Sequence, residues 1–364
     1  MKTSIGAAVF SSLALVFGAA RVEAGVADKK LDVYWVDVEG GAATLFVTPA
    51  GETVLVDTGY PGDRDADRVK KTVTELAGMK KIDFLVITHF HDDHYGGLSD
   101  IVKRVPVGAL YTRDLAHAPE SERKNPLVPQ LVETKVGKRA RIKPGAELPL
   151  KQAKGAAKLS FRFVGADEKF VAQKGAKPNL DLCSGATHHD PDTSDNKNSV
   201  VMLVSFGPFR FFDGGDLTYN TEGALVCPKN LVGTTVDVYQ TDHHGLDQSN
   251  NPVLVKTLVP TVAVMNSGPR KGAEKATFAA LQETASIKDI YQVHRNVRTG
   301  PELNAKPELV ANADENCKGE HIKLSVDPTG KSYVVSVPST KHEATYEVQP
   351  RDDKPRPGKR TAAR

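Results

Sequence analysis

The residues best suited to chemistry in this chain lie in one short stretch, residues 88–97, which read Thr-His-Phe-His-Asp-Asp-His-Tyr-Gly-Gly. Three histidines and two aspartates fall within six of these positions. Imidazole and carboxylate groups together suit zinc, manganese or iron. Two close pairs, His89 with His91 and Asp93 with His94, have the spacing to serve two adjacent ions. The stretch therefore predicts a metal-binding loop, and the alternative is a surface loop that happens to be rich in His and Asp.

The segments around this stretch are those that would hold such a loop rigidly. Residues 82–87 are apolar and largely β-branched, which is typical of a buried strand. Gly96 and Gly97 then interrupt the pattern and permit a tight turn. A strand that ends in a short loop dense in ligands is a suitable support for a metal site.

Further polar groups follow other predicted strands. The strand expected at residues 53–56 ends at Asp57, and the hairpin expected at residues 199–212 ends at Asp213-Gly-Gly-Asp216. The strand expected at residues 236–240 runs into His243 and His244. The chain thus offers several ligand groups in order, each at the end of a strand.

This order of motifs resembles the metallo-β-lactamase superfamily of hydrolases, whose signature is His-x-His-x-Asp-His followed by a later Gly-Asp and a later His. The resemblance implies an α/β fold, the αβ/βα four-layer sandwich of that superfamily. It also implies two divalent metal ions, Zn²⁺ or Mn²⁺, with Asp216 as the carboxylate that bridges them. The ligands that it implies are His89, His91, Asp93, His94, Asp216 and His243.

Within the superfamily, the chain is most similar to the hydrolase domain of ComEC-type DNA-uptake proteins. The shared features are the His-His-Gly segment at residues 243–245, Asn198-Ser199 at the start of a strand, and Val-Asp-Val at residues 36–38 before the later Asp57-Thr-Gly. Asp57 and Asn198 would then support the metal loop from behind the ligands. ComEC-type proteins join this domain to a membrane channel that this chain lacks, so a role in DNA uptake does not carry over.

One feature departs from the superfamily pattern. Lactamase-type members have a Gly-His-Thr turn that supplies a third histidine to the first metal, and this chain has no histidine at the equivalent place. Asp195 is the residue we expect to ligate instead, and Asn198 is the alternative. His188 and His189 lie several residues too early.

The resemblance implies that the two ions lower the pKa of a bound water and supply hydroxide at neutral pH. Asp93 would also orient that hydroxide. His244 is assigned to the substrate, where it would protonate the leaving oxygen, although the order of His243 and His244 stays open. Phosphodiester hydrolysis is the favoured activity. The alternatives are a lactone or β-lactam hydrolase and a non-catalytic binding protein on the same fold.

The two ends of the chain differ from its body. Residues 1–24 combine Lys2, an apolar run and a small-residue cleavage site, which predicts a signal peptide and a periplasmic or secreted bacterial protein. A membrane anchor is the alternative, but the apolar run is shorter than a span requires. We expect the hydrolase domain at residues 28–345 and a basic, disordered tail at residues 350–364.

Charge limits the kind of substrate. Residues 1–24 carry a net charge of +1 and the tail carries +4, so about −2 of the total of +3 remains on the body. A body so close to neutral is unlike the basic surface of a duplex-DNA binder. We therefore expect a small or single-stranded phosphodiester as the substrate. The basic stretch at residues 135–158 has no interleaved aromatic residues and is interpreted as a solvated β-meander.

Cysteines are few and dispersed. In an oxidising compartment, one pair among Cys183, Cys227 and Cys317 is expected to be bridged, without an indication of which pair. None of the three has the spacing of a zinc ligand.

Overall fold

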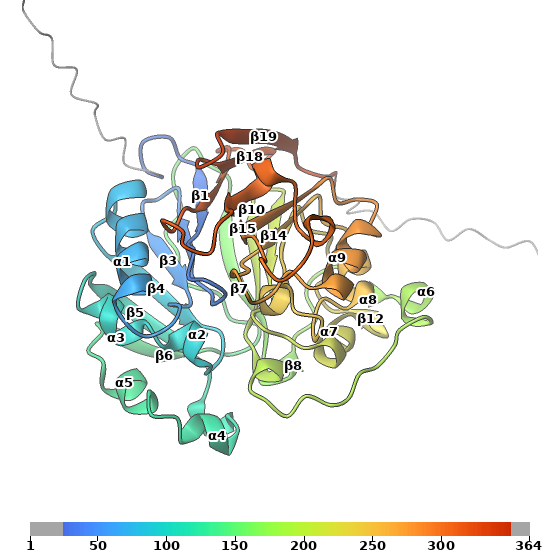
Figure 1. Cartoon of the computed structure of the whole chain (residues 1–364), viewed down its shortest axis with the longest axis horizontal. Coiled ribbons are helices and arrows are strands. Elements are labelled where there is room, and N and C mark those ends of the chain that lie inside the picture. Colours follow the sequence, from blue (N-terminus) through green and yellow to red (C-terminus); the bar gives the residue numbers. More distant parts are fainter. Residues whose placement is uncertain (1–24, 351–364) are drawn as a thin grey trace, which may run out of the picture.

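The structure is a computed structural model of the chain and describes residues 25–350. Two large sheets stand side by side with helices on their outer faces (Figure 1). The predicted signal peptide, and the predicted tail apart from Pro350, lie outside the described residues. Within residues 25–350, no helix has both the length and the apolar character that crossing a membrane requires.

The first sheet has nine strands in the order β19-β18-β17-β1-β2-β3-β4-β5-β6. It begins as an antiparallel meander and becomes parallel from β3 to β6. Its strands are β1 (Leu31–Trp35), β2 (Thr44–Val47), β3 (Thr53–Val56), β4 (Ile82–Ile87), β5 (Val107–Thr112), β6 (Lys138–Arg141), β17 (Ile322–Val326), β18 (Ser332–Val337) and β19 (His342–Glu347).

The second sheet has eight strands in the order β16-β15-β14-β13-β11-β10-β7-β8. Its strands are β7 (Leu159–Ala166), β8 (Lys169–Phe170), β10 (Val201–Phe206), β11 (Phe209–Asp213), β13 (Val238–Gln240), β14 (Val262–Met265), β15 (Asp289–His294) and β16 (Val310–Asn312). A separate small pair joins β9 (Lys177–Pro178) to β12 (Lys229–Asn230).

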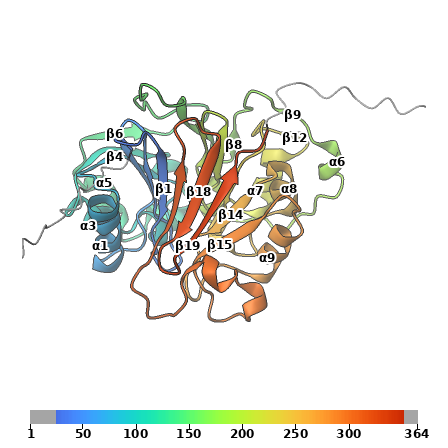
Figure 2. The ribbon, with the colours of Figure 1, turned by 90° about the horizontal axis from the view of Figure 1, so that it is seen from above.

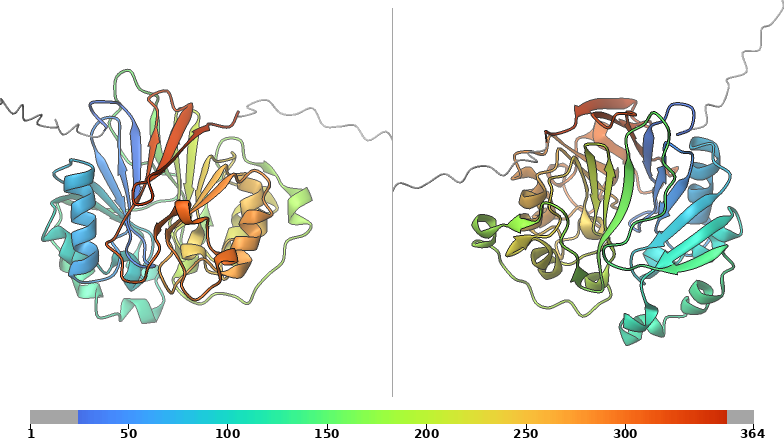
Figure 3. Two further views of the ribbon diagram at one scale, coloured as in Figure 1. Left: turned by 45° about the horizontal axis from the view of Figure 1, so that its top comes forward. Right: turned by 180° about the vertical axis from the view of Figure 1, so that it is seen from behind.

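Helices occupy the outer faces of both sheets, as Figures 2 and 3 show from three further sides. The α-helices are α1 (Asp63–Lys71), α2 (Asp92–Tyr95), α3 (Leu98–Val102), α4 (Glu120–Arg123), α5 (Val128–Glu133), α6 (Leu180–Cys183), α7 (Tyr219–Val226), α8 (Pro252–Leu258) and α9 (Lys275–Gln282). Shorter turns of other helix types are η1 (Thr72–Leu76), η2 (Leu115–His117), η3 (Asn196–Asn198), η4 (Asp242–Gly245), η5 (Pro301–Leu303) and η6 (Pro307–Leu309).

Three apolar clusters define four layers. The central cluster joins the inner faces of the two sheets and contains Trp35, Phe46 and Phe211. A second cluster packs the outer face of the first sheet against α1, α3 and α5, and a third packs the outer face of the second sheet against α7, α8 and α9. Because parallel strands such as β4 are covered on both faces, they carry continuous apolar runs. The αβ/βα four-layer sandwich expected from the resemblance is therefore confirmed.

The prediction of a β-meander at residues 135–158 was wrong. These residues form one strand, β6, and an isolated bridge between Glu147 and Arg162, because Pro144 and Pro149 interrupt a ladder. In the first half of the chain, α1 continues into a π-helical turn at η1.

A disulfide joins Cys183 to Cys227, and Cys317 is free. Cys183 ends the short helix α6 within the long irregular segment 166–195, and Cys227 directly follows α7. The bond therefore attaches that segment to the second sheet's helical layer.

Candidate metal centre

Ligand-type side chains from both sheets meet where their strands end. Strand β4 leads into the loop of residues 88–91 and then α2, while β11 leads to Asp216 and β13 leads to η4. In Figure 1, α2 lies on the side of the first sheet that faces the second. The backbone of His243 and His244 has φ of 54° and 57°, a left-handed turn that directs two consecutive side chains into the centre.

One carboxylate oxygen is the hub of this centre. Oδ2 of Asp216 lies 3.1 Å from Nε2 of His94 and 3.3 Å from Nε2 of His244. The same oxygen is 3.6 Å from Nε2 of His243 and 3.8 Å from Nε2 of His89. All these side chains are buried. Asp216 is thus placed between imidazoles from both halves of the fold, as a bridging carboxylate would be.

Four residues form the tightest group. The ligand atoms of Asp93, His94, Asp216 and His244 all lie within 4.8 Å of one another. Nε2 of His244 is 3.2 Å from Oδ2 of Asp93 and 3.2 Å from Nε2 of His94. The sequence-based assignment gave His243 to the metal and His244 to the substrate, and the geometry favours the reverse.

His243 and His91 lie at the edges of the group. Nε2 of His243 is 3.2 Å from the amide nitrogen Nδ2 of Asn196, and its Nδ1 is 3.2 Å from the hydroxyl of Ser249. His91 is a quarter exposed, its ring centroid is 4.6 Å from that of His89, and its Nε2 is 3.8 Å from Oε1 of Glu122. His89 and His91 therefore point to a second position beside the first group.

The protonation states of most of these groups suit metal binding. Burial, and then the neighbouring His94, lower the pKa of His89 well below its usual value, and burial lowers the pKa of His243 to about 4. Both rings are therefore neutral at pH 7, with a lone pair available. Burial alone would raise the pKa of Asp216, but His244 and His94 hold it well below the usual range, so its carboxylate is ionised.

Asp57 fixes the orientation of His94. Its Oδ2 accepts hydrogen bonds from Nδ1 of His94 at 2.7 Å and from the hydroxyl of Thr88 at 2.7 Å, and its Oδ1 accepts one from the Thr88 backbone N–H at 2.8 Å. With Nδ1 donating to Asp57, Nε2 of His94 faces Asp216. Burial alone would lower the pKa of His94, but Asp216, Asp93 and Asp57 raise it well above its usual value, so a bound metal ion would replace the Nε2 proton. Carboxylate–histidine pairs of this kind orient metal-binding histidines in proteins.

Asp195 does not reach the centre, contrary to the sequence-based expectation. It forms a fully buried ion pair with Arg113 and accepts hydrogen bonds from the Phe90 backbone N–H at 2.8 Å and from Nδ2 of Asn198 at 3.1 Å. Its carboxylate is thus occupied by a cation and two donors. Asn198, expected behind the ligands, donates to Asp195, which in turn accepts from the Phe90 N–H of the metal loop.

Two residues at the centre were not predicted. Nζ of Lys271 lies 2.5 Å from Oδ2 of Asp93, and its side chain is 30% exposed. Asn196 holds a buried amide oxygen without a hydrogen-bond partner in the described structure. Lys271 carries no sequence signal because it lies 27 residues after His244 in an irregular segment. Asp195 and Asn198, which were candidates from the sequence, lie on either side of Asn196 in the chain.

The residues present fit metal ions. Nε2 of His89 is fully buried without a hydrogen-bond partner, which is costly unless another species occupies it. The donor set mixes imidazole and carboxylate groups without thiolate, a combination that suits Zn²⁺ or Mn²⁺. His89, His91, Asp93, His94, Asp216 and His244 are thus in a position to hold such ions.

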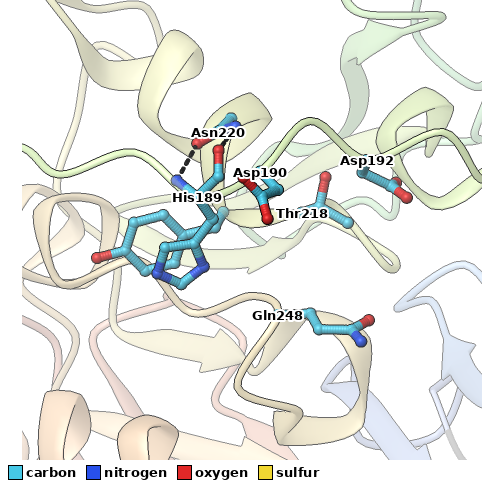
Figure 4. Close-up of a pocket in the computed structure, with 7 residues that line it drawn as sticks. His189, Asp190, Asp192, Thr218, Asn220 and Gln248 are labelled. Carbon is cyan, nitrogen blue, oxygen red and sulfur yellow. Dashed lines mark hydrogen bonds between the residues drawn. The ribbon is translucent and has the colours of Figure 1, made fainter.

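An open pocket of about 570 Å³ is lined by the residues drawn in Figure 4. His189, Asp190 and Asp192 come from the long irregular segment, and Thr218, Tyr219, Asn220 and Gln248 complete the lining. The His189 ring stacks on Tyr219 with centroids 3.6 Å apart, and Asn220 bonds both the N–H and the C=O of His189. Thr218 follows Asp216 by two residues, and Gln248 directly precedes Ser249, which contacts His243, so two lining residues lie close in the chain to residues of the centre.

Comparisons with known proteins agree with this geometry. The sequence model of the metallo-beta-lactamase superfamily matches residues 36–164. A UPF0173 metal-dependent hydrolase of Polynucleobacter asymbioticus is 31% identical over 106 residues, which are 28% of this chain and 35% of that protein. Competence protein ComA of Neisseria gonorrhoeae is 24% identical over 229 residues, which are 63% of this chain and 26% of that protein.

The aligned regions thus span only about a quarter to a third of these relatives. Among solved structures, a putative metal-dependent hydrolase from Parabacteroides distasonis has 16% identity, with 72% of this chain and 93% of that chain covered and a TM-score of 0.38. The match to ComA confirms the ComEC-type resemblance. The superfamily match over residues 36–164 and the arrangement of the two sheets agree, so the chain has the fold of the metallo-β-lactamase superfamily.

Proposed function

We propose that this protein is an exported, metal-dependent hydrolase that cleaves phosphodiester bonds of small or single-stranded substrates. The observation that carries the hydrolase part is the position of Asp216, whose Oδ2 lies within 3.8 Å of four histidine nitrogens from both sheets. Two divalent ions bound there would activate water and polarise a phosphoryl oxygen.

Some residues of the centre would bind the metal ions, and others would act on the substrate. His89 and His91 would hold one ion, and Asp93, His94 and His244 the other, with Asp216 shared between them. Asn196 is the candidate for the remaining position of the first ion, because its amide oxygen is buried and unpartnered. The ligand set then consists of four imidazoles, two carboxylates and one amide oxygen, a mixture that suits Zn²⁺ or Mn²⁺.

His243 is the candidate proton donor to the leaving oxygen. It is buried but lies at the edge of the four-residue group, and Ser249 supports its Nδ1 at 3.2 Å. The Ser249 hydroxyl donates to the Leu217 carbonyl and therefore accepts from Nδ1–H of His243, which leaves Nε2 facing the centre to take up a proton and pass it on. A group in this position can deliver a proton as the phosphorus–oxygen bond breaks.

Lys271 favours an anionic substrate over a neutral one. Its ammonium group sits at the edge of the centre, 2.5 Å from Asp93, and remains partly open to solvent. A cation placed there can contact a non-bridging phosphoryl oxygen and stabilise charge in the transition state. A neutral lactone offers no such charge.

The surroundings favour a short substrate. Asp190 and Asp192 line the open pocket, and a carboxylate-lined wall repels a polyanion. A phosphodiester with one polar substituent fits that pocket better than a duplex with phosphates on both sides. This agrees with the charge of about −2 on the body of the chain.

A substrate panel tests the proposal. Protein loaded with zinc or manganese should hydrolyse bis(4-nitrophenyl) phosphate, or a dinucleotide, with a higher kcat/KM than a lactone or a β-lactam. Asp216→Ala should abolish this turnover and leave the circular dichroism unchanged. If a lactone or β-lactam is hydrolysed at least as efficiently as every phosphodiester tried, the protein is a hydrolase of carbonyl substrates instead.

Lys271→Met tests the choice of substrate separately. Loss of a charge-assisted contact of about 1.5–3 kcal/mol should lower kcat/KM for the phosphodiester roughly 10- to 150-fold. Lys271→Arg is the matched control because it keeps the charge. The bound metal must be measured in both variants, since Lys271 contacts Asp93. An equal effect on a neutral lactone would show that Lys271 does not recognise the phosphoryl group.

A further inference from the structure

A second cluster of ligand-type groups lies apart from the proposed catalytic centre. It consists of Asp37, which follows β1, His294, which ends β15, and Cys317, which lies between β16 and β17. One ligand atom from each of the three lies within 4.8 Å of the others. Asp37 and His294 are fully buried, and Cys317 is partly buried.

The imidazole of His294 is oriented as a ligand. Its Nδ1 lies 2.9 Å from the Arg295 carbonyl oxygen, which can only accept, so Nδ1 carries the proton. Nε2 then has a free lone pair, and it is buried without a hydrogen-bond partner in the described structure. Metal-binding histidines characteristically donate their other ring N–H to a carbonyl in this way. A buried ring nitrogen without a hydrogen-bond partner indicates that another species, such as a metal ion, binds there.

The other two groups already contact each other. Sγ of Cys317 donates to Oδ2 of Asp37 at 3.0 Å, so one thiol proton lies between the two candidate ligand atoms. Burial and Asp37 raise the pKa of the Cys317 thiol to about 11, which keeps this proton in place at neutral pH. A divalent ion would take the place of the proton.

The local charges allow a divalent cation. Arg68 contacts Oδ2 of Asp37 at 3.1 Å and Oε1 of Glu39 at 3.0 Å, and its NH2 is 3.5 Å from Sγ of Cys317. Arg64 also pairs with Glu39 and with Asp65. With the thiol deprotonated, Asp37, Glu39, Asp65 and Cys317 supply four negative charges against two positive charges on Arg64 and Arg68. A divalent ion makes this set neutral.

We propose that Asp37, His294 and Cys317 form a structural site for a thiophilic divalent ion, with Zn²⁺ as the expected metal. One oxygen, one nitrogen and one sulfur ligand match the borderline-soft character of zinc, and the partly exposed side of Cys317 leaves room for a fourth, water ligand. Binding releases the Cys317 proton to solvent and forms a metal–thiolate bond, without any change in oxidation state.

The site would link the two sheets beside the catalytic centre. Asp37 belongs to the first sheet's side and His294 to the second's, and the loop after Asp37 packs on the metal loop, where the Ala42 N–H bonds the Asp93 carbonyl at 3.0 Å. A metal ion at this place would therefore fix the position of Asp93 relative to the second sheet.

Cobalt substitution tests this site apart from the catalytic one. Co²⁺ bound by a thiolate gives a sulfur-to-cobalt charge-transfer absorption, and the catalytic centre contains no cysteine. Under non-reducing conditions, Cys183 and Cys227 stay paired, so Cys317 is the chain's one free thiol. Chelator-treated full-length protein titrated with Co²⁺ should show this absorption.

Three variants show which residues give rise to the charge-transfer absorption. Cys317→Ser should lose the absorption and about one equivalent of cobalt, and Asp216→Ala should keep the absorption. His294→Gln should weaken cobalt binding at least tenfold as followed by the same absorption, and it serves if Cys317→Ser does not fold. Bound Zn²⁺ should also protect Cys317 from alkylation.

Absence of the absorption in the wild type at saturating cobalt would overturn the proposal. So would unchanged cobalt binding in His294→Gln. Neither result bears on the hydrolase proposal, because that centre uses none of these three residues.

Discussion

Replacing Asp195 by Ala separates a structural role for this residue from the ligand role that the sequence suggested. Asp195 and Arg113 are both completely buried, and the Arg113 guanidinium also lies 4.6 Å from the Phe90 ring centroid. Removing the carboxylate leaves a buried cation with one remaining partner, Asp167, at 2.7 Å. It also leaves the Phe90 backbone N–H without its acceptor.

The expected magnitude follows from these contacts. Breaking a buried ion pair by removing one partner costs about 3–5 kcal/mol. The remaining contact with Asp167 reduces that cost, while the unsatisfied Phe90 N–H adds about 1–3 kcal/mol. We therefore expect the free energy of unfolding to fall by about 4 kcal/mol, with the number of bound metal ions unchanged.

Urea denaturation followed by tryptophan fluorescence measures this loss, because Trp35 is the chain's one tryptophan and is buried between the sheets. Elemental analysis of the same samples gives the metal content. Asp167→Ala is the matched control, since its carboxylate is 20% exposed and its loss should cost about 1 kcal/mol. The double variant with Arg113→Met should lose less than Asp195→Ala alone, because no unpaired cation remains.

The opposite pattern would refute this reasoning. If Asp195→Ala binds one ion fewer and unfolds at the same urea concentration as the wild type, Asp195 is a ligand, and the ion pair with Arg113 does not describe the metal-loaded protein.

Two further predictions follow from individual contacts. Asp57→Ala should weaken metal binding about 10- to 100-fold in a chelator competition, since His94 loses the group that orients it, and an unchanged affinity would contradict this role. Replacing both Cys183 and Cys227 by Ser should lower the free energy of unfolding by about 4 kcal/mol, from the entropy of closing a loop whose ends are 44 residues apart. Amide hydrogen exchange in residues 166–195 should become faster in that variant, and unchanged stability and exchange would show that the segment is held without the bond.

The metal loop could be located from the sequence because its signals are local. A buried apolar run, a dense set of ligands and two glycines fall within 16 residues, and the same pattern of a strand followed by ligands recurs at Asp216 and at residues 243–244. The buried strands were recognisable because each is covered on both faces, which forces a continuous apolar run.

The errors at the site concern contacts between distant residues. The sequence could not show that Arg113 pairs with Asp195 across 82 positions, and a carboxylate near the expected place was therefore assigned to the metal. Lys271 was missed for the same reason, as its contact with Asp93 spans 178 positions. The order of His243 and His244 depends on two consecutive left-handed residues, where the alternation of an extended strand does not apply.

The centre also depends on how the two sheets are held together, because each sheet supplies half of the tightest ligand group. Asp93 and His94 follow β4, whereas Asp216 and His244 follow β11 and β13. A polar contact lies in the apolar layer between the sheets: Oε1 of Gln240 accepts hydrogen bonds from Nε1 of Trp35 at 2.7 Å and from the Thr44 hydroxyl at 2.9 Å.

This contact restricts the register of one sheet on the other in a way that apolar packing alone does not. A slide of even one residue would leave the Trp35 N–H buried without an acceptor, at a cost of about 1–3 kcal/mol. Gln240 lies two residues before the turn Asp242–Gly245, which carries His243 and His244, so this contact between the sheets is close in the chain to the ligands that follow β13. Metal–ligand distances can vary by only a few tenths of an ångström. A directional hydrogen bond next to the ligand turn helps to keep the ligands from the two sheets within that range.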